Sequence, residues 1–187
     1  MESVTSYINQ FLIAMPGMAD PNFSSSVTLI CEHNDEGAMG IVINRPTEHT
    51  LADLFAQLAI DEYEDEIAGQ PIFYGGPVTP ERGFVLHEPT GAWDSTMSVS
   101  PDIRVTLSRD ILEAIAAGRG PQRFLMALGY AGWEKGQLEE EMLANSWLTV
   151  TASADIVFDT PFSQRWALAA RQLGFDISHL STDAGHA

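Results

Sequence analysis

The sequence predicts an α+β fold built on a mainly antiparallel or mixed sheet. Short apolar runs typical of strands outnumber the amphipathic helical segments, and several neighbouring runs are joined by tight turns. The strict alternation of strand and helix that builds a doubly wound parallel sheet is absent. We therefore expect mostly antiparallel pairing between strands that follow each other along the chain.

The first third of the chain predicts three strands. Compact apolar runs occupy residues 11–15, 27–31 and 38–43. Residues 34–37 supply turn chemistry ending in a glycine, so the second and third strands should form an antiparallel hairpin. Residues 20–23 favour a single helical turn, because an aspartate precedes a proline there.

A helix is predicted over residues 50–59. Thr50 can cap it, with Asp53 three residues further on, in a pattern close to a capping box. Its apolar stripe consists of Leu51, Leu54, Phe55 and Leu58. The acidic run that follows, 61–66, is interpreted as a solvated loop or helix end.

The middle of the chain predicts further short strands. The expected strands are 71–74, 82–87 after a turn at Pro80-Glu81, and a hairpin of 97–100 with 104–107. Ser108 should cap a helix over 109–117 that Gly118 stops.

The last third predicts three strands and two helices. The expected elements are a strand at 124–128, an acidic helix at 136–144, a strand at 147–151, a short strand at 156–158, and a final helix that Thr160 caps, with Pro161 at its first position and Gly174 at its end.

Length and composition predict one domain spanning residues 1–187. Such a chain is long enough for one substantial core, and its 45% apolar content is ordinary for a globular protein. Its apolar runs are all shorter than a membrane span requires. The first basic residue is Arg45, so the apolar run at 11–15 lacks the preceding positive segment of a secretory signal. We therefore expect a cytoplasmic protein that does not enter membranes.

The net charge of −17 restricts the partners of the protein. The chain carries 26 acidic and 9 basic residues, and the basic residues are scattered. Proteins that bind nucleic acid draw much of their affinity from clustered Lys and Arg on phosphates, and an acidic surface repels those phosphates. No helix-turn-helix with a basic recognition helix is recognisable. Direct nucleic-acid binding is therefore disfavoured.

Motifs for catalysis or cofactors are largely missing. The sequence contains no Walker loop, dinucleotide-binding fingerprint, zincin motif or nucleophile elbow. The single cysteine, Cys31, rules out an intrachain disulfide and a zinc site made of several cysteines. Cys31 and His33 share one face of a predicted strand, but a metal would need further ligands, of which His87 is the best candidate. We expect no metal and no cofactor.

Three segments are candidates for binding a ligand or partner. The first is the strand exit Asn44, Arg45 and Pro46, where a planar guanidinium could meet a carboxylate or phosphate, or pair with an internal carboxylate. The others place glycines beside aromatic and basic residues, which can build a groove or simply a tight corner. They comprise Gly75, Gly76 and Pro77, and, from the strand at 82–87, Arg82, Gly83 and His87.

Ordered blocks along nearly the whole chain carry a family resemblance. These blocks are residues 11–16, Asp20-Pro21 with Phe23, 37–46, 75–78, 82–87, 128–133 with 136–139, and Asn145 with Trp147-Leu148. In order and spacing they resemble the AlgH/YqgE family of bacterial proteins. The resemblance implies a single α+β domain with a bifurcated sheet folded into a pseudo-barrel and flanked by helices. It also implies a role in regulation, because AlgH takes its name from a role attributed in regulating alginate production.

The expected function follows from combining this resemblance with the charge. We expect an indirect regulator that acts through a protein partner or a small ligand, bound in a groove formed by the three candidate segments. The alternative from another class is an enzyme, such as a hydrolase or a nucleotide-processing enzyme, that uses Arg45 with His33 or His87.

Overall fold

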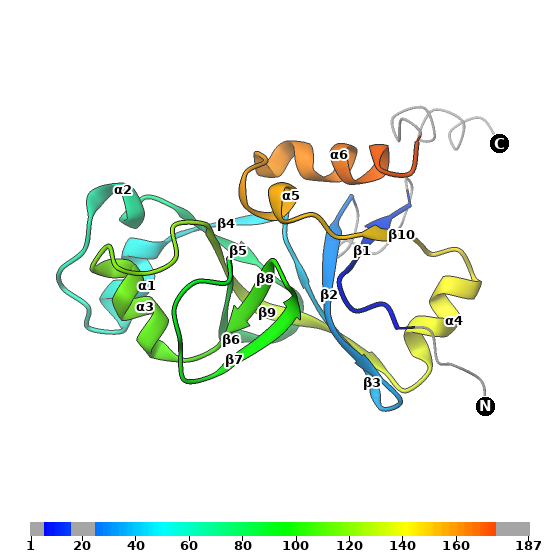
Figure 1. The fold of residues 1–187 in the computed structure, drawn as a ribbon, viewed down its shortest axis with the longest axis horizontal. Helices are drawn as coiled ribbons and strands as arrows, with labels where there is room; N and C mark the ends of the chain where they lie inside the picture. Colours follow the sequence, from blue (N-terminus) through cyan, green and yellow to red (C-terminus); the bar gives the residue numbers. More distant parts are fainter. Residues whose placement is uncertain (1–5, 16–24, 175–187) are drawn as a thin grey trace.

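The computed structural model describes residues 6–15 and 25–174 (Figure 1). Within these residues the strands are β1 (Gln10–Ala14), β2 (Val27–Asn34), β3 (Gly37–Val42), β4 (Pro46–Thr50), β5 (Pro71–Tyr74), β6 (Val78–His87), β7 (Thr96–Ser100), β8 (Ile103–Thr106), β9 (Phe124–Glu134) and β10 (Trp147–Thr151). The helices are α1 (Leu51–Gln57), α2 (Asp65–Ala68), α3 (Arg109–Ala116), α4 (Gln137–Leu143), α5 (Ala154–Phe158), α6 (Arg165–Arg171) and the 3₁₀ turn η1 (Phe162–Gln164).

The strands form one curled, branched sheet. Its main path runs β10-β1-β2-β3-β9-β6-β8-β7, and β4 and β5 form a side branch attached to β9. All pairs are antiparallel except β5 with β9, which is parallel. The predicted α+β class with a mainly antiparallel, bifurcated sheet is therefore confirmed.

The branch point lies on β9. One edge of this strand pairs with β6, while the other edge pairs first with β5, through Ala127 and Leu128, and then with β3, from Ala131 onward. Gly75 joins the branches, because its N–H donates to the Leu128 carbonyl (2.8 Å) and its carbonyl accepts from the Val42 N–H (2.8 Å). One long strand thus holds three others that are distant in sequence.

Gly129 changes which face of β9 each side chain occupies. Before it, Leu125 and Ala127 contribute to the largest core cluster; after it, Tyr130 packs against that same cluster. The left-handed backbone of Gly129 (φ 78°) shifts the alternation by one residue, as a β-bulge does. Ala131 then faces a separate core cluster that includes Leu138 of α4.

The helices cover different parts of this sheet (Figure 1). Helices α1, α2 and α3 gather at one end, where Leu51, Phe55 and Ile111 bury against β5 and β9 residues. Helix α6 lies across β1, β2 and β10, and α4 packs beside β3, β9 and β10. Among the described residues, no helix combines the length and apolar character needed to cross a bilayer.

Several predicted elements are confirmed. The β2–β3 hairpin pairs Asn34 with Gly37 at its turn. Helix α1 begins after Thr50, whose N–H donates to Asp53 Oδ2 at 2.9 Å. The residues of the acidic run 61–66 are all exposed. The predicted helical turn at 20–23 lies outside the described residues.

Four details of the prediction are wrong. The segment 156–158 is the end of helix α5, because Ile156 and Val157 reach the core from a helix and this packing outweighs their strand propensity. Strand β6 continues through Pro80-Glu81, absorbing the predicted turn in a register shift between Val78 and Gly83. Strand β9 continues past residue 128 to Glu134. The final helix begins at Arg165, after the 3₁₀ turn, instead of at Pro161.

Candidate binding groove

A groove of about 1040 Å³ opens on the curled sheet and is exposed to solvent along one side. The β2–β3 hairpin and the end of β9 form one wall, and β6, β7 and the residue after β8 form the other. Its lining residues are Glu32, Asn34, Glu36, Gly37, Ala38, Met39, Val78, Arg82, Phe84, Met97, Leu107, Tyr130, Gly132, Trp133, Glu134 and Gln137.

The floor of the groove is a part of the core that is left uncovered. Met39, Met97 and Tyr130 are half-buried and pack against the largest core cluster. Phe84 belongs to that cluster, and its ring meets the Tyr130 ring edge to face with centroids 5.8 Å apart. Exposed apolar surface that continues a core gains free energy when a partner covers it, at roughly 25 cal/mol per Å².

Three exposed carboxylates stand on the wall opposite β7. Glu32 and Glu36 come from the β2–β3 hairpin, and Glu134 ends β9. A register shift in β2 between Ile30 and Glu32 turns Glu32 toward the groove. Because these carboxylates line the same groove in an acidic protein, they favour cationic groups at this wall.

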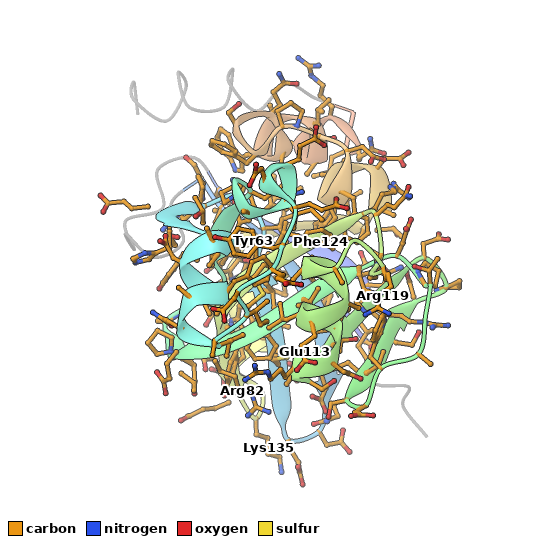
Figure 2. The ribbon with its side chains drawn as sticks, turned by 90° about the vertical axis from the view of Figure 1, so that its left-hand side faces the viewer. Tyr63, Arg82, Glu113, Arg119, Phe124 and Lys135 are labelled. Carbon is orange, nitrogen blue, oxygen red and sulfur yellow. The ribbon has the colours of Figure 1, made fainter. Side chains whose placement is uncertain are left out.

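Arg82 is the basic residue among the lining side chains. Its guanidinium lies over the Phe84 ring, 6.0 Å from the centroid. In Figure 2, Arg82 and Lys135 lie toward the lower end of the molecule, below Glu113 and Phe124. Arg82 is thus the one basic side chain among the described lining residues, which are otherwise acidic, uncharged polar or apolar.

The predicted strand exit lies away from the groove. The side chain of Asn44 is used structurally, because its Oδ1 accepts from the Val27 N–H and its Nδ2 donates to the Ser25 carbonyl, both at 2.9 Å. Arg45 is half-buried, and its carbonyl accepts from the Tyr74 N–H at 2.7 Å. Pro46 is exposed at the start of β4. Whether Arg45 serves a ligand stays a prediction.

The glycines Gly75, Gly76 and Gly129 form the fork, where the two branches of the sheet separate. A Cβ on Gly75 would lie 2.3 Å from the Gly129 carbonyl oxygen, and a Cβ on Gly76 would lie 2.1 Å from the Tyr130 carbonyl carbon. These glycines allow backbones to cross closely, as the tight-corner interpretation requires. Pro77 follows them as an exposed residue.

In the last predicted segment, Arg82, Gly83 and His87, the histidine lies in the core and the arginine lines the groove. His87 is fully buried; its Nδ1 lies 2.7 Å from the Glu88 carbonyl, and its Nε2 lies 2.7 Å from Thr106 Oγ1. Burial lowers the pKa of His87 below its ordinary value, so the ring is neutral and donates through Nδ1 while accepting from Thr106. Gly83 lies within β6 beside the flexible end of Met126. Of the nine predicted residues, only Arg82 lines the groove.

The pairing of Arg45 with His33, one form of the enzymatic alternative, does not come together. His33 accepts from the Tyr7 N–H through Nδ1 (3.0 Å) and donates through Nε2 to Glu139 Oε1 (3.1 Å). His33 and Arg45 lie at opposite ends of the β2–β3 hairpin, separated by roughly 20 Å at about 3.3 Å per strand residue. Burial raises the pKa of the Cys31 thiol to about 12, which makes it a poor nucleophile. No group of three or more metal-binding side chains occurs in the described part of the chain.

The sequence analysis missed a buried arginine beneath the strand exit. Arg165 donates to the Thr160 carbonyl (3.0 Å) and to the Ile43 carbonyl, and it lies 5.1 Å from the Phe73 ring centroid. Burial lowers its pKa to about 10, so it remains charged at neutral pH. No sequence signal distinguished Arg165 from the surface arginines. The groove residues Tyr130, Gly132 and Glu134 occur at every second position of the sequence, a spacing that indicates a shared face of one strand.

Comparisons with known proteins match most or all of the chain. The family model described as AlgH-like matches residues 11–178. A UPF0301 protein of Thioalkalivibrio sulfidiphilus is 57% identical over 187 residues, covering 100% of both chains. A UPF0301 protein of Saccharophagus degradans is 57% identical over 179 residues, covering 96% of this chain and 88% of the relative.

Two solved structures share the architecture. The solution structure of the AlgH protein from Pseudomonas aeruginosa matches with a TM-score of 0.81 and 47% identity, covering 100% of this chain and 99% of that one. The crystal structure of a protein from Corynebacterium diphtheriae matches with a TM-score of 0.75 over 97% of this chain and 94% of that one. Its identity of 19% supports a likeness of fold only.

Proposed function

This chain belongs to the AlgH-like family, and we propose that it is a regulatory binding protein. In the proposed function its groove holds a basic, amphipathic segment of a protein partner, and the protein does not bind DNA itself. The observation that carries the proposal is the pairing of an apolar floor with three carboxylates on one wall. Apolar contact supplies affinity, and charge complementarity selects and steers the partner.

The size and openness of the groove favour a chain segment over a small molecule. Pockets for small molecules are mostly enclosed and measure about 300–1,000 Å³. This groove is at the upper limit of that range and is open along one side. A segment of a larger protein can fill such a space while its remaining residues stay in solvent.

The charges of the protein support regulation without direct DNA contact. The chain carries a net charge of −17. Some of its basic side chains are already paired, including Arg109 with Glu113 and Arg123 with Asp155 and Asp159. Binding a DNA backbone would require several arginines or lysines to meet phosphates together.

The proposal is tested with a display library of random octapeptides selected on the wild-type protein. We expect enriched peptides that combine Lys or Arg with apolar residues. Their affinity is then measured for the groove triple variant Glu32→Gln, Glu36→Gln and Glu134→Gln. The expected result is at least about tenfold weaker binding, since three exposed charge contacts of ~0.5 kcal/mol each sum to that factor.

A matched triple variant controls for net charge. Asp61→Asn, Glu62→Gln and Glu66→Gln remove three exposed charges from the acidic run and should leave peptide affinity within about twofold, because these residues are not in the groove. Equal weakening in both triple variants, or no enriched peptide, would contradict groove binding. Sequence-specific gel shifts of DNA at physiological salt would contradict the regulatory mode.

A further inference from the structure

Strand β7 ends the sheet with an unpaired edge. Leu107 N–H donates to the Ser95 carbonyl, and Thr96 and Ser98 stand opposite Thr106 and Arg104. Antiparallel strands alternate hydrogen-bonded and non-hydrogen-bonded pairs, so the backbone N–H and C=O groups of Thr96 and Ser98 point outward. The short contact between the Thr96 and Thr106 hydroxyls (2.7 Å) fits a non-hydrogen-bonded pair. Among the described residues, no backbone group binds this outer edge.

The sequence of β7 does not protect this edge. Edge strands usually carry a proline or charged side chains that prevent further pairing. The branch strand β4 does so with Pro46 and Glu48. The strand Thr96–Ser100 contains neither kind of residue, and its outward groups belong to small, exposed Thr96 and Ser98.

The open edge borders the groove. Met97 of β7 lines the groove and is half-buried, while its neighbours Thr96 and Ser98 are exposed. A strand added beside β7 would therefore direct every second side chain over the apolar floor, toward the wall that carries Glu32, Glu36 and Glu134.

We propose that the partner segment binds as an extended strand added to β7, with alternate apolar and Lys or Arg side chains facing the groove. This inference rests on the proposed function and specifies how the partner is held. Main-chain hydrogen bonds to Thr96 and Ser98 supply affinity that does not depend on sequence, and the groove selects the alternate side chains.

Charge favours a basic partner over a second copy of this chain at the same edge. Two copies would bring together molecules that each carry a net charge of −17. A basic segment instead meets the acidic wall across the groove. A concentration-dependent dimer that Ser98→Pro abolishes would assign the edge to a second copy and overturn the proposal.

The test compares Ser98→Pro with Ser98→Ala, using the octapeptides selected on wild type. Both variants lose the bond from Ser98 Oγ to the Ser100 carbonyl, but only proline removes the outward N–H. Proline is tolerated on an edge strand where the N–H faces solvent, so the fold should persist in circular dichroism. We expect Ser98→Pro to bind at least tenfold more weakly than Ser98→Ala.

A second measurement keeps the test decisive if Ser98→Pro fails to fold. N-methylation of single peptide residues should weaken binding to wild type at every second position, because only alternate amides face β7. If the groove triple variant weakens binding while Ser98→Pro equals Ser98→Ala and methylation has no alternating effect, strand addition is wrong and groove binding survives. If the groove triple variant has no effect, the proposed function itself fails.

Discussion

Strand β9 builds two regions of opposite character within a few residues. At the fork, Gly129 packs so closely that a Cβ there would lie 2.4 Å from the Gly76 carbonyl oxygen. Further along the same strand, Tyr130 and Glu134 line a groove open to solvent. The fork admits no additional atom, whereas the groove leaves apolar surface and carboxylates uncovered.

This difference teaches how to interpret the glycine-rich segments of the sequence. Gly75 and Gly76 suggested a binding site, but their backbones are occupied by other backbone. The groove is instead lined by side chains of several strands, and the shifted alternation after Gly129 places Tyr130 on the same surface as Met39. We expect substitutions at the fork to affect stability and substitutions in the groove to affect binding.

The largest effect is expected at the fork. Gly129→Ala should lower the free energy of unfolding by about 2–4 kcal/mol, from overpacking and from the cost of a left-handed backbone. Gly136→Ala is the matched control, since its φ of 76° nearly equals the 78° of Gly129 but nothing lies within 4 Å of its Cβ. It should cost only about 1 kcal/mol in denaturant unfolding. Equal losses would mean that close approach at the fork is unimportant.

The next effect concerns the buried arginine near the fork. Arg165→Met should lower stability by about 2 kcal/mol, because the Ile43 and Thr160 carbonyls lose a charged donor. The gain from no longer burying a charge offsets part of this loss. Arg171→Met, on the exposed side of α6, should change stability by less than about 0.5 kcal/mol. A stabilised Arg165→Met protein would refute the structural role of these bonds.

A pH-dependent effect is expected at His87. Its folded pKa lies below the 6.5 of an unperturbed histidine, so the unfolded chain binds a proton first as pH falls. His87 therefore contributes stability above pH 6.5 that is lost as pH falls below that value, by up to about 1.4 kcal/mol per pH unit.

Unfolding curves between pH 5 and 7 measure this contribution. His87→Gln should be less stable than wild type at pH 7, and its stability should fall by about 1 kcal/mol less across this range. His49→Gln, at an exposed histidine, controls for loss of the residue type. Parallel pH profiles for wild type and His87→Gln would contradict a neutral buried ring.

The smallest stability effect is expected in the groove. The triple variant Glu32→Gln, Glu36→Gln and Glu134→Gln should keep the free energy of unfolding within about 0.5 kcal/mol of wild type. A slight increase is reasonable, because like charges are removed from one wall. A loss above about 1 kcal/mol would show that these carboxylates support the fold, which would erase the contrast with the fork.

Much of the fold could be predicted because its signals are local. The β2–β3 turn and the Thr50–Asp53 cap each depend on a few neighbouring residues. The wrong predictions arose where tertiary packing decides. Ile156 and Val157 have strand propensity but fill the core from a helix, and β6 continues through Pro80 at a register shift.

The groove could be predicted only in part, because it depends on contacts between distant segments. Arg82 was recognised as a candidate, but Met97 and Glu32 acquire their positions from the curl of the sheet and from the irregularity in β2. Asn44 and His87 have polar side chains that suggested a site. Their partners, Val27 and Thr106, become visible only in three dimensions.

The pairing of β9 also constrains how the protein can be made. Strands β3, β5 and β6 all precede β9 in the chain, and β1 pairs with β10, which follows it. During synthesis β1, β2 and β3 can pair with one another early, but their sheet cannot join β5 and β6 until β9 is made, and the free edge of β1 waits for β10. Until β9 leaves the ribosome, the emerging chain exposes strand edges that a chaperone would have reason to shield.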